Sequence, residues 1–301
     1  MKLKNLMVVV RANFLLLAVV LGFLGTSLAW YEQQEYGSSF NLGYAFLAGF
    51  GLVLAHISVN VFNDYFDFRS KLDYKTPRTP FSGGSKALVD GLITAKQALR
   101  LAIGSLVIAA AVGIFFTLVE GWLLLPLLLV AAIIILIYTP FILKIGYPEW
   151  AAGLGLGTLP ILGAYFIQTG EYHITAFIAS VPSGILVHNL LLLNEFADVE
   201  ADKTVKRRTL PITVGKKNAA IIYSALTAVM YLWIIGAVIT GDMPAFSLLG
   251  LLTIPLAYKA IDGSFKSNDM AKLVPAMANN VFIVLLTQLL MGIGFILGGV
   301  F

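Results

Sequence analysis

The stretch NDYFDFRSKLDYKTPRTPFSGGSKALVDG, residues 63–91, is a long polar passage in a chain that is otherwise strongly apolar. It directly follows an apolar segment and gathers several charged side chains: Asp64, Asp67, Asp73, Lys75 and Arg78. A second polar stretch, NEFADVEADKTVKRRTLPITVG at residues 194–215, follows another apolar segment in the same way. The sequence therefore raises the question of why charge collects at these two places.

The apolar segments around these stretches predict membrane-spanning helices. The chain has 301 residues, of which 59% are hydrophobic and only 12% are charged. Its apolar runs approach about 20 residues, the length that crosses a bilayer as a helix. Because lipid offers no hydrogen bonds, backbone groups must pair within the segment, as they do in a helix. We predict nine spans, at about 10–30, 42–62, 97–118, 122–140, 150–168, 174–194, 217–240, 244–261 and 275–299.

The fold class that follows is all-α, a polytopic membrane protein built as a nine-helix bundle with a cytoplasmic cap of two motif-bearing loops. We treat residues 1–301 as a single membrane-embedded domain. The first apolar run resembles a secretory signal, but Arg11 splits it and eight further runs follow, so we expect a retained helix. The sequence has no cysteine, which excludes disulfides and thiolate chemistry.

The basic residues predict the orientation of the bundle. With nine spans, all 20 Lys and Arg fall on one side of the membrane. The opposite connections hold only acids: Glu32, Glu35, Glu120, Glu171 and Asp242. Basic residues favour the cytoplasmic side, so we predict a cytoplasmic amino terminus and cytoplasmic polar stretches in a cell membrane. This rule explains the net charge of +4 without a nucleic-acid partner, but it does not explain the eleven other acids.

The two polar stretches also repeat a pattern. Asn63 and Asp67 have the spacing of Asn194 and Asp198, 131 positions later. Arg-Thr pairs follow at 78–79 and 208–209, each with a proline close behind. Duplication is common in polytopic membrane proteins, so we predict two related halves, about 1–140 and 141–301.

Helical periodicity would bring these carboxylates together. Residues four apart share a helix face, so Asn194, Asp198 and Asp202 form one stripe. If the two helix ends face each other, four aspartates surround one small volume: Asp64, Asp67, Asp198 and Asp202. Such a cluster repels itself near a membrane unless a cation neutralises it. Oxygen ligands without clustered His or Cys select a hard cation, Mg²⁺ before Mn²⁺ or Ca²⁺.

The basic residues beside the aspartates predict a phosphorylated ligand. Mg²⁺ bound by a few carboxylates usually completes its shell with water and substrate phosphates. A diphosphate would also suit the neighbouring cations: Lys75, Arg78, Lys206, Arg207 and Arg208. The SGGS turn at 82–85 adds backbone N–H groups that can bind an anion. A diphosphate at the membrane surface above an apolar bundle points to an isoprenoid diphosphate whose tail lies among the helices.

The same residues carry a family resemblance. NDYFD followed by Asp73, together with NEFADVEAD, resembles the two aspartate-rich motifs of the UbiA superfamily of intramembrane prenyltransferases. The first family motif is usually Asn-Asp-x-x-Asp-x-x-x-Asp, and this chain has Lys71 at the last position. The position of Asp73 and the run KRRTLPITVGKK are more similar to the MenA-like branch, which prenylates 1,4-dihydroxy-2-naphthoate in menaquinone biosynthesis. The helix layout matches the family over the whole chain, and the motif identity covers about 60–91 and 190–217.

The resemblance implies roles for individual residues. It implies that the first Mg²⁺ is bound by Asn63, Asp64 and Asp67 and the second by Asp198 and Asp202. It also implies that Mn²⁺ can substitute for these ions. It leaves open whether Asp73 replaces the missing aspartate. The remaining substrate-binding assignments are Asn60 and Asn194 as polar supports, Arg78, Lys144 or Arg208 on the diphosphate, and Tyr138 in the pocket.

These assignments predict a carbocation reaction. Metal ions neutralise the leaving diphosphate of a geranylgeranyl diphosphate-like donor as the allylic C–O bond breaks. The bundle keeps water from the allylic cation, and an aromatic acceptor attacks it through carbon. Loss of a proton, or of CO₂ from a dihydroxynaphthoate, restores aromaticity. The aspartates act as metal ligands, and the sequence names no general base and no obligate protein partner.

Three alternatives stay open at this point. The acceptor could instead be 4-hydroxybenzoate or geranylgeranylglyceryl phosphate. A secondary transporter would also show repeated halves, but it predicts charges near the middle of its spans. A CDP-alcohol phosphotransferase binds a diphosphate through aspartates, but its Asp-Gly-x-x-Ala-Arg run is absent from the sequence.

Overall fold

The computed structural model describes residues 3–36 and 40–301, and within these ranges it is helical with no strand. Lys2, one of the 20 basic residues predicted to lie on the cytoplasmic side, is outside the described residues. Nine helical segments among the described residues are long and apolar enough to cross a membrane, as the sequence predicted. They run as Ala12–Gln34, Leu42–Arg69, Ala95–Glu120, Leu124–Ile145, Glu149–Thr169, Ile174–Lys203, Lys216–Ile239, Ala245–Phe265 and Met270–Val300.

Several spans are built from more than one helical element. The uninterrupted α-helices are α3 (Leu42–Arg69), α4 (Ala95–Glu120), α9 (Ile174–Lys203), α11 (Lys216–Ile239) and α13 (Met270–Val300). The composite spans join shorter pieces: η1 (Ala12–Phe14) with α2 (Leu16–Tyr36), α5 (Leu124–Ile137) with η3 (Tyr138–Ile142) and α6 (Leu143–Ile145), α7 (Glu149–Gly153) with η4 (Leu154–Thr158) and α8 (Leu159–Thr169), and η5 (Ala245–Thr253) with α12 (Ile254–Phe265). Short helices α1 (Leu3–Val9), η2 (Leu72–Tyr74) and α10 (Leu210–Thr213) lie outside the spans.

Local sequence explains where the helices begin and break. Asn41, Thr94 and Asp269 each accept a backbone hydrogen bond at the start of a long helix, and Thr94 forms a capping box with Gln97. Arg11 adopts a left-handed backbone conformation with φ of 52°, which separates α1 from the first span. The elements η3 and η4 are π-helical turns, which are frequent at functional sites.

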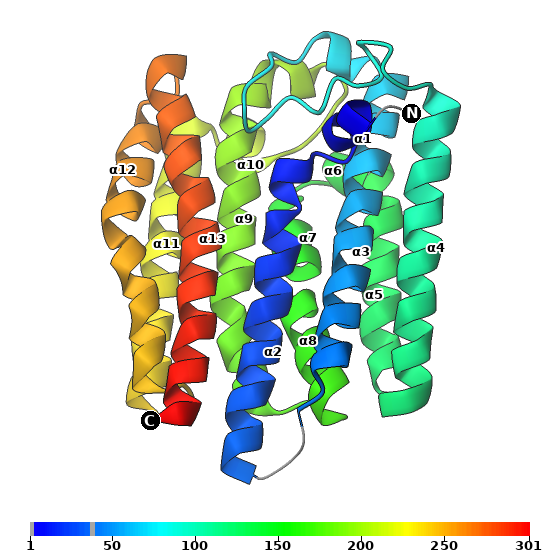
Figure 1. Ribbon diagram of the computed structural model, residues 1–301. Helices are drawn as coiled ribbons and strands as arrows, with labels where there is room; N and C mark the ends of the chain where they lie inside the picture. The colour runs from blue at the N-terminus through cyan, green and yellow to red at the C-terminus, as the bar shows by residue number, and fades with distance from the viewer. Residues whose placement is uncertain (1–2, 37–39) are drawn as a thin grey trace.

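The bundle has its amino terminus and its polar connections at one end (Figure 1). The segment between α3 and α4 and the segment after α9 both lie at the end where α1 lies, whereas the carboxyl terminus lies at the other. α3, α4 and α5 pack together on one side, and α11, α12 and α13 pack on the other, with α2 and α9 between them. This arrangement places both motif-bearing helix ends at the same end of the molecule.

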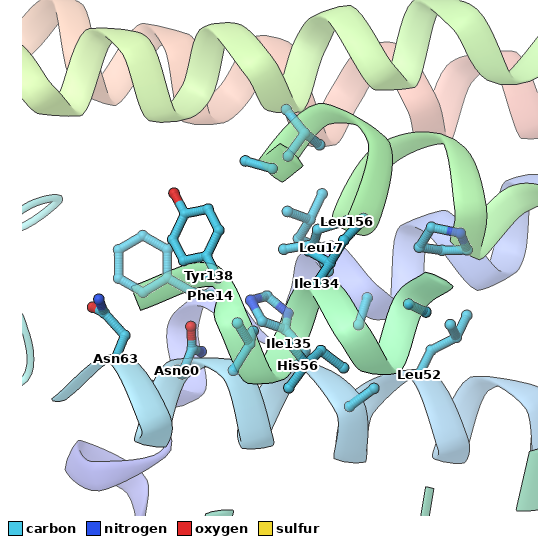
Figure 2. Close-up of a pocket in the computed structure, with 18 of the residues that line it drawn as sticks. Phe14, Leu17, Leu52, His56, Asn60, Asn63, Ile134, Ile135, Tyr138 and Leu156 are labelled. Carbon is cyan, nitrogen blue, oxygen red and sulfur yellow. The ribbon is translucent and has the colours of Figure 1, made fainter. Parts of the chain in front are cut away.

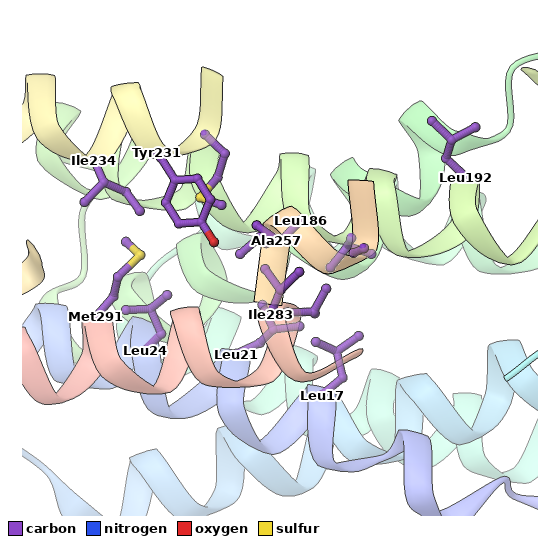
Figure 3. Packing of buried hydrophobic residues seen from close by; sticks show 14 of the residues in the cluster. Leu17, Leu21, Leu24, Leu186, Leu192, Tyr231, Ile234, Ala257, Ile283 and Met291 are labelled. Atoms are coloured by element: carbon purple, nitrogen blue, oxygen red, sulfur yellow. The ribbon is translucent and has the colours of Figure 1, made fainter. Parts of the chain in front are cut away.

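The largest buried core holds the central helices to the carboxyl-terminal ones (Figure 3). Leu17, Leu21 and Leu24 of α2 face Ile283 and Met291 of α13. The core continues over α9, α11 and α12 through side chains that include Leu186, Ile234 and Ala257. Away from this core, α3, α4 and α5 expose many apolar side chains, as surfaces in contact with lipid do.

Candidate active site

A large cavity lies between the two motif helices and is polar at one end (Figure 2). Its volume is about 540 Å³. Asn60, Asn63 and Tyr138 lie toward one end of the view, and Leu52 lies toward the other. Ala48 and Asp67, on the same helix, both line the cavity, so it extends for roughly 28 Å at about 1.5 Å per residue. The cavity thus joins a charged opening to a long apolar chamber.

The first motif lies on the last turns of α3, not in the loop that follows. Asp64 and Asp67 are both buried, with 3% and 6% exposure. Asn60, Asn63 and Asp67 line the cavity from one helix face, as their three- and four-residue spacing requires. The Asn63 Nδ2 donates a hydrogen bond to Thr139 Oγ1 at 3.3 Å, which connects α3 to the π-helical turn η3.

Arg11 neutralises the first motif. Its guanidinium forms a partly buried ion pair with Asp64 and donates a hydrogen bond to Asn63 Oδ1 at 3.2 Å. The left-handed turn at Arg11 ends α1, and its side chain lines the cavity beside these two residues. From the sequence, Arg11 is expected only to split the first apolar run. A lone basic residue inside an apolar run was the signal that could have identified it.

The second motif lies on the last turns of α9, and Arg207 joins it to the first. Asp198 and Asp202 both line the cavity. The Arg207 guanidinium pairs with Asp202 Oδ1 at 3.0 Å and also forms an ion pair with Asp67. Burial acts to lower the pKa of Arg207, but Asp67 and Asp202 outweigh it and raise that pKa above its usual range. The two acidic helix ends therefore meet around one buried cation.

Backbone hydrogen bonds fix which of the two adjacent arginines enters the site. The Arg207 N–H bonds to the Asp202 carbonyl at 3.1 Å. Arg208 bonds to Leu143 O at 3.0 Å through its N–H, and its carbonyl accepts from Tyr147 N at 2.9 Å. With the segment held in this way, Arg207 lines the cavity and Arg208, which the resemblance assigned to the diphosphate, is exposed.

The SGGS turn closes over the site and links it to the second motif. Ser82 Oγ donates a hydrogen bond to Asp198 Oδ1 at 3.3 Å. Gly84 has a positive φ of 72°, and a Cβ there would lie 2.9 Å from Asp73 Oδ1 and 3.3 Å from Asp64 Oδ1. A side chain at Gly84 would therefore displace the carboxylates as well as strain the backbone.

Asp73 lies inside the site, whereas Lys71 does not. Asp73 is buried and lines the cavity close to Asp64, and Lys71 is exposed with a positive φ of 59°. Burial, together with the charges of Asp67 and Asp64, raises the pKa of Asp73 to about 7. The Lys86 ammonium donates to the backbone carbonyls of Asp73 and Thr76, which holds η2 against the loop.

Of the other residues predicted to bind substrate, some line the cavity and others do not. Tyr138, Asn194 and Asn60 line the cavity. Arg78 is exposed and lies 3.7 Å from Asp90, outside the cavity. Lys144 instead lines a second hollow of about 460 Å³, which shares Asp67 and Arg207 with the main cavity. His56 of α3 is also buried and lines the cavity.

The oxygen atoms of the two motifs are of the kind that binds a hard divalent cation. In this structure arginine side chains lie among them. Asp64 Oδ2 and Asn194 Oδ1 are buried and have no hydrogen-bond partner among the described residues. No three acidic or histidine side chains within 3–36 and 40–301 are close enough together to hold a metal ion as they stand. Arg11 and Arg207 lie between the carboxylates and supply the positive charge. Oxygen donors that already attract cations are the ligands that Mg²⁺ prefers.

Comparison with known proteins gives consistent matches over most of the chain. The model of the UbiA prenyltransferase family matches residues 20–286. The 1,4-dihydroxy-2-naphthoate octaprenyltransferase of Bacillus subtilis is 34% identical over 224 residues, covering 73% of this chain and 70% of that protein. The digeranylgeranylglyceryl phosphate synthase of Pyrococcus furiosus is 30% identical over 232 residues, covering 74% and 73%.

A solved structure has the same fold. The structure of a UbiA homolog from Archaeoglobus fulgidus bound to GPP and Mg²⁺ superposes with a TM-score of 0.63. The match covers 95% of this chain and 99% of that one at 15% sequence identity. At this identity the match establishes the shared helical architecture.

Proposed function

Because this chain belongs to the UbiA prenyltransferase family, we propose that it transfers a prenyl group from an isoprenoid diphosphate to a 1,4-dihydroxy-2-naphthoate-like acceptor. The chain is an integral membrane prenyltransferase, and this excludes the transporter and phosphotransferase alternatives. One observation supports the donor class above all others. Two acidic helix ends meet at the polar opening of one long apolar cavity.

The diphosphate would lie at the polar opening. Arg11 and Arg207 already face this volume and can turn from the carboxylates toward the phosphate oxygens. Loop residues from Phe81 to Gly84 line the same volume and would cover the ligand. The cavity below is lined mainly by apolar side chains, which would hold the prenyl tail and exclude water from the allylic cation.

The carboxylates would hold the metal ions. Asp64 and Asp67 on α3 and Asp198 and Asp202 on α9 are the ligands that we assign, with Asn63 beside them. Two bound Mg²⁺ ions would supply the charge that stabilises the departing diphosphate. Asp73 would take the role of the family aspartate that is Lys71 here, because Asp73 lies beside Asp64 and Lys71 is exposed.

The acceptor assignment rests on the relative from Bacillus subtilis and on the Asp73 spacing. Geranylgeranylglyceryl phosphate is the second candidate, because the relative from Pyrococcus furiosus is named for a product of that class. The orientation that we propose places the site on the cytoplasmic face of the cell membrane, since the described basic residues of the loops lie at that end of the bundle.

The test is to incubate purified protein with radiolabelled geranylgeranyl diphosphate, Mg²⁺ and a panel of acceptors. The panel contains 1,4-dihydroxy-2-naphthoate, 4-hydroxybenzoate and geranylgeranylglyceryl phosphate, and the product is identified by mass spectrometry. We expect prenylation of the naphthoate. Transfer only to the glyceryl phosphate would replace the acceptor assignment, and transfer to none of the three would reject the proposed function.

A further inference from the structure

A pair of buried glutamates lies beside the cavity and has no part in the metal and diphosphate assignments. Glu195 on α9 is 5% exposed and Glu149 at the start of α7 is fully buried. The two carboxyl groups lie near enough to interact electrostatically. Because two buried carboxylates that lie near each other repel, the pair favours a state in which only one of them is ionised.

The two members of the pair differ in what they contact. Glu149 Oε1 accepts a hydrogen bond from the Leu210 N–H at 2.7 Å, which fixes this carboxyl to the segment after Arg208. No hydrogen-bond donor among the described residues reaches either carboxyl oxygen of Glu195. Leaving a buried carboxyl without donors is costly, and functional groups are the usual exception. Glu195 therefore has free acceptor capacity.

The position of Glu195 in the cavity indicates which substrate it would meet. Glu195 lines the cavity and lies three residues before Asp198 on α9. At about 1.5 Å per residue it lies roughly 4.5 Å deeper than Asp198. Below it the helix contributes Leu190 and Leu191 to the apolar wall. Glu195 is therefore at the boundary where a bound diphosphate would end and the allylic carbon would begin.

We propose that Glu195, buried near Glu149, accepts the hydroxyl proton of the aromatic acceptor as its ring attacks the allylic carbon. This inference rests on the proposed prenyl transfer to a phenolic acceptor. Apart from Glu149, the charged or titratable groups that interact electrostatically with Glu195 are Asp202, Arg207 and Tyr138. Arg207 is paired with two aspartates, so no cation forms an ion pair with Glu195 within the part of the chain that the structure describes.

Atoms and electrons balance in this step. The acceptor O–H bond breaks, its proton passes to the Glu195 carboxylate, and the O–H electron pair forms a ring carbonyl. A ring π pair forms the new bond to the allylic carbon, while the allylic C–O pair leaves with the diphosphate. The ring carbon then loses CO₂, or a proton to the diphosphate, and its electron pair restores the aromatic ring. The carbonyl oxygen takes back the proton from Glu195, which is regenerated.

The test compares wild-type protein with Glu195→Gln and with Glu200→Gln. Glu195→Gln keeps the size of the side chain, so we expect the fold to be retained, and this is checked by size-exclusion chromatography. Glu200 is on the same helix but is exposed and paired with Lys203, which makes it a matched control. Each protein is assayed for Mg²⁺-dependent binding of labelled geranylgeranyl diphosphate, for prenylated acceptor and for free prenol.

We expect Glu195→Gln to bind the diphosphate like the wild type, while prenylated product falls by about 10²- to 10⁴-fold, the range typical of a lost general base. The ratio of prenol to prenylated product should rise. The loss should be smaller for acceptors with a more acidic hydroxyl group, which need less help to ionise. A purely structural glutamate would not produce this dependence on acceptor acidity.

Three outcomes would overturn the inference. The first is prenylation by Glu195→Gln within about threefold of the Glu200→Gln control, well below the range expected for a lost general base. The second is loss of diphosphate binding in a correctly folded Glu195→Gln, which would make Glu195 part of the metal site. The third is a wild-type protein that prenylates no acceptor, which rejects the proposed function as well and is thereby distinguishable from the first two.

Discussion

Arg207 forms an ion pair with Asp67, although 140 residues separate them in sequence. The same guanidinium contacts Asp202, so one cation is shared by two aspartates from different motifs. A divalent cation could bind at the same place, because the carboxylates that surround the guanidinium are the natural ligands of Mg²⁺. The arginine therefore marks the point at which the two halves of the site meet.

Removing a carboxylate from either motif should stop the reaction. Asp67→Asn and Asp198→Asn keep the shape of the side chain but lose its charge, so we expect prenyl transfer to fall by at least about 10²-fold. Membrane insertion and elution from size exclusion should be unchanged. Asp262→Asn is the control, because Asp262 is exposed and pairs locally with Lys266. Turnover near the wild-type rate in either motif variant would reject these ligands.

Removal of the metal should be reversible. We expect EDTA to stop prenyl transfer and added Mg²⁺ to restore it, since the donor set is composed of oxygen atoms. Mg²⁺ together with the diphosphate should also raise the thermal unfolding midpoint, because a ligand that binds only the folded state stabilises it. Activity that persists in excess chelator would contradict a metal-dependent reaction.

Replacing Arg207 should show whether it stabilises the metal-free protein by occupying the place of a divalent cation. Arg207→Ala leaves Asp67 and Asp202 without a cation, and breaking a buried ion pair costs about 3–5 kcal/mol. The metal-free variant should unfold at a lower temperature than the wild type, and Mg²⁺ should raise that temperature by more than it does for the wild type. The neighbouring Arg208→Ala is the control, because Arg208 is exposed. Equal Mg²⁺ responses in the two variants would show that Arg207 does not occupy the cation site.

Asp73 and Lys71 can be compared directly. We expect Asp73→Asn to raise the Mg²⁺ concentration needed for half-maximal transfer by about tenfold, the usual order for a lost metal-site partner. Lys71→Ala should leave that concentration unchanged, because Lys71 is exposed. If a Mg²⁺ titration instead showed a higher half-maximal concentration for Lys71→Ala and no change for Asp73→Asn, the metal-site role would belong to position 71.

The apolar chamber should limit the length of the prenyl chain. Gly163 lines the cavity on α8, and a Cβ there would meet only Leu127 Cδ2, at 3.6 Å. Gly163→Leu should therefore fit the backbone but fill part of the chamber, shifting donor preference toward shorter diphosphates. Gly104→Leu is the control, because Gly104 is also in a span with open space around it but does not line the cavity. A competition assay with donors of different length should show a shift for Gly163→Leu alone.

The sequence by itself determined the nine spans, the segregation of charge and the shared face of each motif. These features follow from hydropathy and from the helical period, which act over a few turns and need no distant contact. The motif aspartates could be placed on two helix ends for that reason. The prediction that both ends face one volume agrees with the cavity that they line, and their roles as ligands remain predictions.

Only the tertiary structure decided which charged side chains enter the site. Residues 204–209 have no period, and their conformation depends on hydrogen bonds to Leu143 and Tyr147, so the choice of Arg207 over Arg208 was not visible in the sequence. Arg11 and Glu195 were hidden for the same physical reason. Arg11 is polar within an apolar run and Glu195 lies where one ends, and only the packing of other helices shows that each borders a cavity and not lipid.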